Sequence, residues 1–240
     1  MSLPVAVLAG GLATRLGPVA KTIPKSLVEV AGRPFAEHQI DWLQSQGARR
    51  IVFLVAHLGE MIAAALGDGR RWGISLEYVY DGASLLGTGG ALKRALPALG
   101  ESFFVLYGDS LLICNLPSIE RAFRASGCAG LMTVLRNDDR WDRSNVQFEN
   151  GRIVRYDKAN RTPDMHHVDY GIGVLTAESL SAFPDDRPFD LAPVYQRLIA
   201  AGNLAAVELF ERFYEIGSPE GLEATRAFLE RRDRHARESS

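Results

Sequence analysis

Two adjacent glycines follow the first apolar run of the chain, and a basic segment follows the glycines. The run Pro4–Ala9 is typical of a buried strand, and Gly10 and Gly11 come directly after it. Because glycine lacks a Cβ, backbone N–H groups there can approach a ligand closely. Three basic side chains, one guanidinium fork and two mobile ammonium groups, come next: Arg15, Lys21 and Lys25. This composition could cradle a triphosphate, and it also suits a glycine-rich turn with solvated charges.

The spacing of these residues excludes two common nucleotide-binding motifs. A Walker loop needs Gly-Lys followed by Ser or Thr, and no such run follows the glycines. The dinucleotide fingerprint G-x-G-x-x-G is absent as well. The first segment therefore indicates phosphate chemistry of another kind.

A second glycine-rich stretch, "LLGTGGALKRAL", covers Leu85–Leu96. Gly87 and Gly89-Gly90 stand at an expected helix start, where Thr88 is a plausible N-cap. We expect free N–H groups and the positive end of a helix dipole at this point. Such a helix start could bind a base, a sugar hydroxyl or a phosphate. A plain turn before a helix is the alternative.

An acidic residue follows the most apolar run of the chain. The run Ser102–Gly108 predicts a buried strand, and Asp109 and Ser110 come next. In open α/β sheets ligands bind beyond the carboxyl ends of the strands. Asp109 is therefore well placed to hold Mg²⁺ through one oxygen while phosphates fill other positions. A helix cap or turn residue is the alternative.

The C-terminal half offers fewer residues of this kind. Lys158 stands at the end of one expected strand, and Asp169 and Gly171 stand in another. Near the end, "GSPE" is typical of a helix start with Ser218 as its N-cap. Glu215 is not explained in this way. It could be a second metal-binding carboxylate or a solvated acidic residue.

Composition excludes several classes of protein. A formal net charge of −2 argues against a protein built mainly to hold a nucleic acid backbone. The two cysteines, Cys114 and Cys128, form no metal or disulfide pattern, and no histidine spacing indicates a zinc protease or a hydrolase triad. We find no signal peptide and no apolar run near the roughly 20 residues that span a bilayer. We therefore expect a cytoplasmic protein without nucleic acid or membrane partners.

The order of strand-like and helix-like runs indicates the fold class. Strands and helices alternate up to Gly108, which predicts a parallel sheet with helices on both faces. After Gly130 strands follow each other closely, and Asn150-Gly151 suits a two-residue hairpin turn. The sequence therefore predicts one α/β domain, residues 1–240, with a mixed, mainly parallel sheet flanked by helices.

Taken in order, these motifs resemble the sugar-phosphate nucleotidyltransferases. The resemblance rests on Gly-Gly with T-R-L, on P-K-S-L, L-G-T-G-G-A, G-D after an apolar strand, and I-G-S-P-E. It is strongest to the short heptose-1-phosphate and mannose-1-phosphate guanylyltransferases. It implies a Rossmann-like nucleotidyltransferase fold and Mg²⁺-dependent transfer of a nucleoside monophosphate to a sugar 1-phosphate. It also implies a nucleotide-binding part near 1–115, a sugar-phosphate-binding part near 116–240, and no C-terminal β-helix domain.

The resemblance assigns roles to individual residues. The implied catalytic groups are Arg15, Lys25 and Asp109. The implied nucleotide contacts are Leu8, Gly10, Gly11, Leu86, Gly87 and Gly89. The implied sugar-phosphate contacts are Lys158, Asp169 and Gly171, and the implied magnesium ligands are Asp109 and Glu215. Many members of the family have Asp where Glu215 stands, so the second metal ligand departs from the usual pattern.

Alternatives stay open at the level of the substrate. A short N-acetylmuramic acid 1-phosphate uridylyltransferase is the runner-up, and a non-catalytic nucleotide-binding subunit of the same fold is a further alternative. A dinucleotide-dependent oxidoreductase would need an acidic residue after the second strand, where His57 follows Arg50–Ala56. The sequence leaves open the nucleobase, the sugar, and whether the protein is a monomer or a homodimer.

Overall fold

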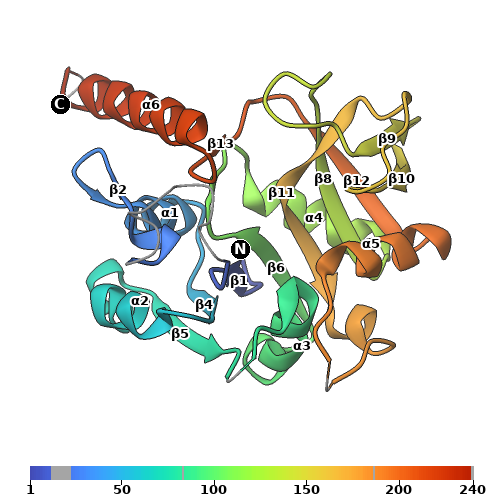
Figure 1. Cartoon of the computed structure of the whole chain (residues 1–240), viewed down its shortest axis with the longest axis horizontal. Coiled ribbons are helices and arrows are strands. Elements are labelled where there is room, and N and C mark those ends of the chain that lie inside the picture. Colours follow the sequence, from blue (N-terminus) through green and yellow to red (C-terminus); the bar gives the residue numbers. More distant parts are fainter. Residues whose placement is uncertain (12–22, 83, 186, 239–240) are drawn as a thin grey trace.

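The computed structural model describes residues 1–11, 23–82, 84–185 and 187–238. At its centre lies a nine-stranded sheet (Figure 1). Four parallel strands form one half of it, in the order β6 (Ser102–Tyr107), β1 (Val5–Leu8), β4 (Arg50–Val55) and β5 (Ser75–Tyr80). Three of them, β1, β4 and β6, are almost wholly buried, as expected for Val-, Leu- and Phe-rich strands covered on both faces.

Antiparallel pairing extends the sheet beyond β6. The long strand β11 (His167–Thr176) runs antiparallel to β6 and to β8 (Gly130–Arg136), and β12 (Leu204–Leu209) pairs in parallel with β8. A hairpin of β9 (Val146–Glu149) and β10 (Arg152–Tyr156) joins the N-terminal end of β11. The predicted mixed sheet is confirmed, and the turn at Asn150-Gly151 has positive φ values of 50° and 78°.

Helices cover both faces of the sheet, as Figure 1 shows. One apolar cluster contains side chains of α1 (Phe35–Ser45), α2 (Gly59–Leu66), α4 (Leu116–Ser126) and α6 (Pro219–Glu238). The other contains side chains of α3 (Gly87–Leu99) and α5 (Leu191–Ala200). Successive residues of β4 alternate between the clusters, because neighbouring side chains of a strand point to opposite faces.

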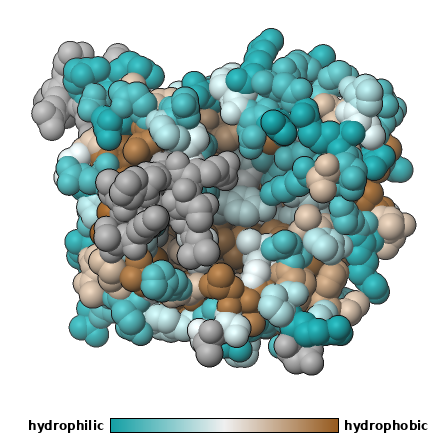
Figure 2. All heavy atoms as spheres, in the orientation of Figure 1, coloured by the Kyte–Doolittle hydropathy of each residue, from teal (hydrophilic) through white to brown (hydrophobic). Residues whose placement is uncertain are grey.

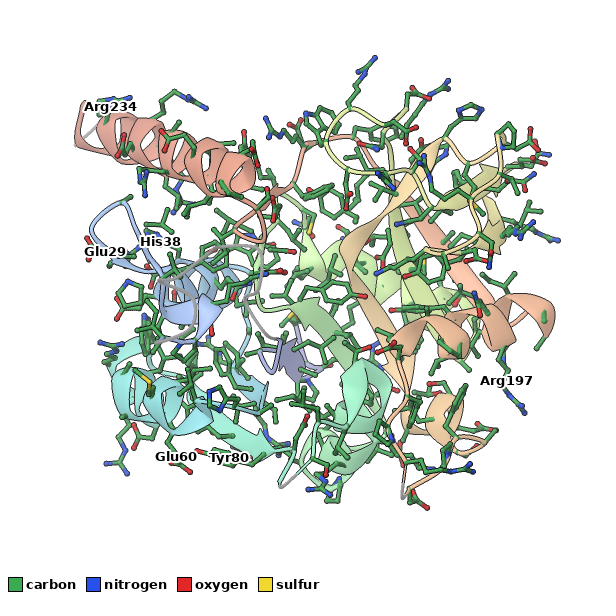
Figure 3. All side chains as sticks on the ribbon, in the orientation of Figure 1. Glu29, His38, Glu60, Tyr80, Arg197 and Arg234 are labelled. Atoms are coloured by element: carbon green, nitrogen blue, oxygen red, sulfur yellow. The ribbon has the colours of Figure 1, made fainter. Side chains whose placement is uncertain are left out.

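The outer faces of the helices are polar. Figure 3 shows the side chains of Arg197 on α5 and Arg234 on α6 projecting away from the body of the protein. In the described residues, no helix combines the length and the apolar character needed to cross a membrane.

Three local features bring distant segments to one edge of the sheet. Strand β1 lies between β4 and β6, so the chain leaves it at the topological switch point, where ligands bind in open α/β sheets. The pairing of β11 with β8 shifts register between Asp169 and Gly173, and Gly171 in this bulge has a φ of 99°. Two short strands, β7 (Ser110–Leu111) and β13 (Tyr214–Glu215), pair so that Glu215 lies opposite Ser110.

Candidate active site

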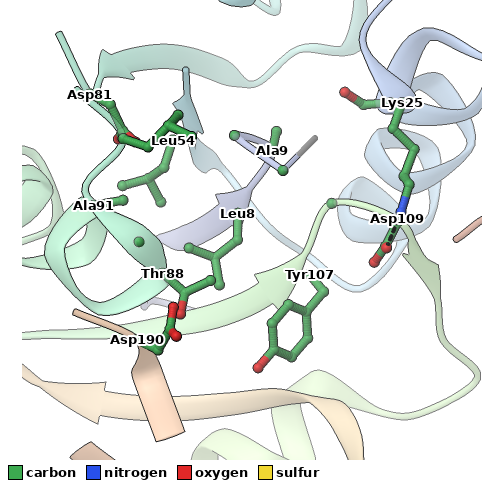
Figure 4. A pocket seen from close by; sticks show the side chains of 16 residues that line it. Leu8, Ala9, Lys25, Leu54, Asp81, Thr88, Ala91, Tyr107, Asp109 and Asp190 are labelled. Atoms are coloured by element: carbon green, nitrogen blue, oxygen red, sulfur yellow. Dashed lines mark hydrogen bonds and ion pairs between the residues drawn. The ribbon is translucent and has the colours of Figure 1, made fainter. Parts of the chain in front are cut away.

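One cavity of about 350 Å³ opens at the carboxyl ends of β1 and β6 (Figure 4). Its walls combine leucine and alanine side chains, glycine turns and a few charged groups. They are Leu8, Ala9, Gly10, Gly11, Lys25, Ser26, Leu54, Asp81, Leu85, Gly87, Thr88, Ala91, Tyr107, Gly108, Asp109 and Asp190. We call this the donor cavity, after the nucleotide donor of the reaction that the sequence predicts. Brown, hydrophobic residues gather in the lower middle of Figure 2, near the position of α3 in Figure 1.

A second cavity, of about 600 Å³, lies beside the first, between β11 and the loops that follow β8, β10 and β12. Charged and hydrogen-bonding side chains dominate its walls. They are Tyr107, Asp109, Ser110, Trp141, Asp142, Arg143, Asn145, Lys158, Arg161, Val168, Asp169, Tyr170, Gly171, Phe213, Glu215 and Ser218. We call this the acceptor cavity, after the sugar 1-phosphate acceptor of the reaction that the sequence predicts.

The two cavities share two wall residues, Tyr107 and Asp109. Asp109 leaves β6 through Gly108, which packs so closely on β1 that a Cβ there would lie 2.8 Å from the Leu8 carbonyl oxygen. This contact holds Asp109 at the switch point. Its Oδ2 accepts a hydrogen bond from the Lys25 Nζ at 2.9 Å, which Figure 4 marks with a dashed line. A ligand in either cavity can therefore reach the Asp109 carboxylate, and the Lys25 ammonium lines the donor cavity beside it.

Glu215 lies at the same junction, on the acceptor side. Its carboxylate accepts hydrogen bonds from the Gly217 N–H and, at 2.6 Å, from the Ser218 hydroxyl. Ser218 in turn caps α6 by accepting a bond from the Gly221 N–H at 3.0 Å, so the predicted helix start is confirmed. A Cβ at Gly217 would lie 2.6 Å from Glu215 Oε2, 3.2 Å from Lys25 Nζ and 3.3 Å from Asp109 Oδ2. The three charged groups thus surround one small region.

This pair of carboxylates fits a magnesium ion. Within the described part of the chain, no three His, Cys, Asp or Glu side chains come together as a complete metal cage. Mg²⁺ does not need one, because it is commonly bound by one or two carboxylates together with waters and substrate phosphates. Asp109 and Glu215 supply that number of carboxylates beside an open cavity. The role of Glu215 as a metal ligand stays a prediction.

The wall of the acceptor cavity contains the ammonium group of Lys158. The Lys158 Nζ lies 3.3 Å from the Tyr107 hydroxyl, 3.8 Å from Asp169 Oδ2 and 5.0 Å from the centre of the Tyr107 ring. Asp169 is almost fully buried and also accepts bonds from the Tyr156 hydroxyl and the Gly171 N–H. Burial, with the Asp169 charge second, raises the pKa of Tyr107 well above its usual value. Tyr107 is therefore a neutral hydrogen-bonding group between the cavities.

The start of α3 differs from the prediction. The helix begins at Gly87 without a side-chain cap, and the Thr88 hydroxyl instead accepts a bond from the Leu191 N–H at the start of α5. The N–H groups of Gly89 and Gly90 both donate to the Phe189 carbonyl oxygen. The prediction of free N–H groups is therefore wrong for Gly89 and Gly90, because a residue about 100 positions later accepts hydrogen bonds from both.

The predicted nucleotide contacts at this helix divide accordingly. Gly87 lines the donor cavity, whereas Leu86 and Gly89 do not line it. A Cβ at Gly89 would collide with the Phe189 ring, so this glycine is required for packing between α3 and the segment before α5. The Leu86 N–H donates to Asp81 Oδ2 at 3.0 Å. Contact of Leu86 or Gly89 with a nucleotide stays a prediction.

The remaining predicted residues gather as expected. Leu8, Gly10, Gly11, Lys25 and Asp109 line the donor cavity, although their segments are separated by up to 100 residues. The predicted acceptor residues line the acceptor cavity, namely Lys158, Asp169, Gly171 and Glu215. Arg15 and Lys21 lie outside the described residues. The catalytic and binding roles of all these residues, Arg15 included, stay predictions.

Sequence reasoning missed several wall residues. Tyr107 directly precedes Gly108-Asp109, so its place at the end of a buried strand was a usable signal. Asp81 directly follows β5 and carried the same signal. The loop residues Trp141, Arg143 and Arg161 carried none, because only the folding of two loops over β11 brings them to the cavity.

Comparison with known proteins identifies the family. The model of the family described as "Nucleotidyl transferase" matches residues 5–146, which is more than half of the chain. The chain belongs to the nucleotidyl transferase family. This confirms the predicted resemblance, and the match contains both β1 and β6, whose ends frame the donor cavity.

Relatives in the family include several sugar-1-phosphate nucleotidyltransferases. An N-acetylmuramate α-1-phosphate uridylyltransferase of Caulobacter vibrioides is 29% identical over 93% of this chain and 95% of its own. A D-glycero-α-D-manno-heptose 1-phosphate guanylyltransferase of Campylobacter jejuni is 27% identical over 89% and 94%. A UTP–glucose-1-phosphate uridylyltransferase of Synechocystis sp. is 26% identical over 94% of this chain, which spans only 63% of that protein.

Solved structures show the same fold. A Bacillus anthracis structure described as a glucose-1-phosphate thymidylyltransferase has a TM-score of 0.85 and 19% identity, with 95% of both chains covered. The structure of HddC from Yersinia pseudotuberculosis complexed with GMP-PN has a TM-score of 0.78 and 21% identity, with 95% and 99% covered. The predicted Rossmann-like nucleotidyltransferase fold is therefore confirmed.

Proposed function

We propose that this protein transfers a nucleoside monophosphate from a nucleoside triphosphate to a sugar 1-phosphate, with release of pyrophosphate. The observation that carries the proposal is the meeting of two cavities at Asp109 and Tyr107. The donor cavity has the apolar walls and glycine turns that suit a nucleotide, and the acceptor cavity has the charged walls that suit a sugar phosphate. The family match and the sugar-1-phosphate nucleotidyltransferases among its relatives support the same reaction.

The reaction follows from this geometry. The triphosphate extends toward Lys25 and Asp109, and the acceptor phosphate lies near Lys158 on the other side of the junction. A phosphate oxygen of the sugar 1-phosphate attacks the α-phosphorus, the bond from the α-phosphorus to the bridging oxygen breaks, and pyrophosphate leaves with that electron pair. The attacking oxygen is already ionised, so the chain needs no general base. Catalysis then consists of positioning and charge neutralisation, which the two lysines supply.

Magnesium belongs to this proposal. Asp109 and Glu215 would hold the ion at the junction, where it would neutralise phosphate charge when bound. Lys25 donates a hydrogen bond to Asp109, so its ammonium group would lie beside phosphates that bind at the junction. Arg15, which the family resemblance assigns to the phosphates, completes the proposed set of cations.

For the substrates, we propose a guanine nucleotide with heptose 1-phosphate or mannose 1-phosphate as the acceptor. The Campylobacter jejuni relative, which bears the name of a heptose 1-phosphate guanylyltransferase, matches over 94% of its length and supports this choice. The product would be a GDP-sugar for surface polysaccharide synthesis, made by a cytoplasmic monomer or homodimer.

One observation favours a second candidate, an N-acetylmuramate 1-phosphate uridylyltransferase. Arg143 lines the acceptor cavity, and among the described residues no hydrogen bond or ion pair engages its guanidinium. An acceptor with a carboxylate, such as N-acetylmuramate 1-phosphate, would supply a partner of the planar shape that arginine prefers. The Caulobacter vibrioides relative bears that name.

Pyrophosphate release tests the proposal and separates the candidates. The protein would be mixed with Mg²⁺, each of five nucleoside triphosphates, and heptose, mannose, glucose or N-acetylmuramate 1-phosphate. We expect release only when a triphosphate and a sugar 1-phosphate are both present, with a nucleotide sugar identified by mass spectrometry. Release without an acceptor would indicate hydrolysis instead. Absence of release with every pair, from protein shown to be folded, would contradict the proposal.

A further inference from the structure

A buried amide binds the backbone on both sides of Asp109, and the proposed reaction does not use it. Gln39 on α1 has an exposed fraction of 0% and lines neither cavity. Its Nε2 donates to the Tyr107 carbonyl oxygen at 3.1 Å and to the Ser110 carbonyl oxygen at 2.6 Å. These two residues flank Gly108-Asp109 in the sequence, so one side chain holds both ends of the backbone that carries the shared carboxylate.

The orientation of this amide follows from its two partners. Both are carbonyl oxygens, so only the NH₂ group can face them, and both of its hydrogens are used. The Oε1 atom is buried, and it accepts no hydrogen bond in the described part of the chain. An unpaired buried acceptor lowers stability, which an apolar side chain of this size would avoid. What Gln39 contributes is therefore its pair of donors, which fix the separation of the two carbonyl groups.

The carbonyl group of Asp109 itself is anchored to the segment that carries Glu215. It accepts a hydrogen bond at 2.9 Å from the N–H of Ile216, which directly follows β13. Ser110 in turn lies opposite Glu215 in the ladder of β7 and β13. A shift of the Ser110 backbone would therefore displace both carboxylates of the junction.

Helix α1 is also tied to the segment that carries Lys25. The Phe35 N–H at the start of α1 donates to the Val28 carbonyl oxygen at 2.9 Å, three residues after Lys25. Gln39 thus connects, through one helix, the segment of Lys25 and the loop of Asp109. The 2.9 Å distance between Lys25 Nζ and Asp109 Oδ2 therefore depends on both segments keeping their positions.

We infer that Gln39 is a positioning residue for the transfer reaction. Through two carbonyl groups it holds the Asp109 carboxylate at the place where Lys25 and the reacting phosphates meet. This role rests on the proposed function, and Gln39 itself touches no substrate in it. Displacement of a reacting group by about 1 Å can cost about 100-fold in rate. Loss of a group that orients a metal ligand costs about 10-fold to 100-fold in metal affinity or activity.

Steady-state pyrophosphate release by Gln39→Met tests this role. Methionine is similar in length to glutamine and lacks both donors. With Mg²⁺ and the nucleotide and sugar 1-phosphate that the wild-type protein uses, kcat should fall about 10-fold to 100-fold. The KM of each substrate should stay within a few-fold, because Gln39 lines neither cavity.

The matched control is Gln46→Met, the same change at the end of the same helix. Gln46 lines neither cavity, and its Oε1 accepts a hydrogen bond from the Leu116 N–H at 3.2 Å. This variant also loses a hydrogen bond between α1 and a distant segment, so its Tm reports the structural cost of such a loss. Its kcat should equal that of the wild type. An equal fall of kcat in both variants would overturn the role of Gln39.

Binding of Mn²⁺ gives a readout that does not depend on turnover. Mn²⁺ prefers the same oxygen ligands as Mg²⁺, and its binding to the protein with nucleoside triphosphate and no sugar phosphate is followed by electron paramagnetic resonance. The affinity should fall about 10-fold to 100-fold in Gln39→Met and stay unchanged in Gln46→Met. Wild-type affinity for Mn²⁺ in Gln39→Met would overturn the role.

A double-mutant cycle with Asp109→Asn separates positioning from a general loosening of the fold. If Gln39 acts through the Asp109 carboxylate, then adding Gln39→Met to Asp109→Asn should change the residual kcat by less than about 3-fold. A fall in the double variant as large as in Gln39→Met alone would show that the two residues act independently, and would overturn the role.

The outcomes separate the two levels of the proposal. A wild-type kcat in folded Gln39→Met would overturn the role of Gln39 and leave the transferase proposal standing. If Gln39→Met does not fold, Gln39→Glu replaces it, because glutamate has the same size and offers at most one donor. Its kcat should fall at least about 10-fold, and a wild-type kcat would overturn the role. Absence of pyrophosphate release from folded wild-type protein would contradict the proposed function, and the role of Gln39 with it.

Discussion

The donor and acceptor cavities meet at one carboxylate, yet they are built from different parts of the sheet. The donor cavity lies at the ends of parallel strands, and its shape depends on backbone turns and on apolar side chains such as the buried Leu54. The acceptor cavity lies over an antiparallel bulge, and its character depends on charged side chains from surface loops. Loops of this kind change more readily than the scaffold that carries them.

The difference suggests how one fold serves many sugars. A nucleotide always presents phosphates, a ribose and a planar base, so a site made from strand ends can remain nearly constant. Sugars differ in their hydroxyl and charged substituents, and the acceptor loops that carry Trp141, Arg143 and Arg161 can follow those differences. The prediction with the largest expected effect concerns Asp109, one of the two residues that the cavities share.

Substitution of Asp109 by Asn changes a side chain that lines both cavities, and we expect it to reduce turnover. The change keeps the size of the side chain and removes the charge that pairs with Lys25 at the junction. We expect kcat to fall by at least about 1,000-fold, because charge stabilisation at a reacting phosphate is worth several kcal/mol. Nucleotide binding should change by less than about 10-fold. Steady-state pyrophosphate release and calorimetry measure the two quantities.

A matched control is Asp164→Asn, the same chemical change at an exposed residue outside both cavities. It should leave kcat unaltered. Near-normal turnover in Asp109→Asn would contradict the placement of the reacting phosphate at the junction.

Substitution of Lys158 by Met should separate the cavities. Methionine keeps most of the chain length and removes the ammonium that lies near Asp169 and over the Tyr107 ring. Asp169, whose side chain has an exposed fraction of 6%, then loses its ion pair with Lys158 and faces the acceptor phosphate. We expect the KM of the sugar 1-phosphate to rise about 10-fold to 100-fold, as for loss of a charge-assisted contact of 1.5–3 kcal/mol.

The affinity of the nucleoside triphosphate is the internal control for Lys158→Met. It should stay within a few-fold of the wild-type value, because Lys158 lines only the acceptor cavity. An equal loss of nucleotide affinity would show that the cavities are not separate in function.

Most of the site could be predicted because its residues follow strands. Gly10 and Asp109 each stand two residues after an apolar strand, and the parallel pairing of β1 with β6 brings the ends of these strands to one edge of the sheet. The hairpin turn and the cap of α6 were equally local, since Asn150-Gly151 and Ser218 act on their own neighbours. Local signals of this kind survive in a single sequence.

The failures concern contacts between distant segments. No residue near Gly89 in the sequence indicates that the Phe189 carbonyl oxygen accepts a hydrogen bond from its N–H. Nor does any indicate that the Phe189 ring fills the space that a Cβ would occupy. Helix α4 is the exception among these failures. It was overlooked despite a local signal, because Asn115 caps it by accepting a bond from the Ser118 N–H at 2.8 Å. Strand β12 was also overlooked, because it pairs with β8, a parallel strand about 70 residues earlier.

Substitution of Gly89 by Ala tests whether that glycine serves packing. In an ordinary helix the change would stabilise the protein by up to about 1 kcal/mol. Here the methyl group would collide with the Phe189 ring, and overpacking of a closed contact costs about 1–3 kcal/mol. We expect a net loss of stability, with a fall in Tm of about 2–4 °C for each kcal/mol lost. Differential scanning calorimetry measures it.

The double variant Gly89→Ala with Phe189→Leu distinguishes packing from ligand contact. The smaller leucine makes room for the methyl group, so part of the lost Tm should return. A Gly89→Ala protein with normal Tm and weak nucleotide binding would instead place Gly89 in contact with the nucleotide.

Two carboxylates near the cavities should change stability with pH in opposite directions, and this is the smallest effect that we expect. In the donor cavity, burial raises the folded-state pKa of Asp81 above its unfolded value, so its charge destabilises the fold as pH rises through that range. At the acceptor side, hydrogen bonds from Arg161 and from the Ser144 N–H lower the pKa of Asp139 to about 2. Its charge therefore stabilises the fold above the unfolded pKa near 4, and this stabilisation disappears as pH falls toward 2.

The variants Asp81→Asn and Asp139→Asn test this difference in the pH dependence of stability. At pH 7, Asp81→Asn should have a Tm equal to or above that of the wild type, and Asp139→Asn should have a lower Tm. Both differences should shrink as the pH is lowered from 7, because protonation of the wild-type carboxylates makes them resemble the amides. Thermal unfolding at several pH values measures both differences. A lower Tm for Asp81→Asn than for the wild type at pH 7 would mean that the Asp81 carboxylate is solvated, and the donor cavity would then resemble the acceptor cavity more than its apolar walls indicate.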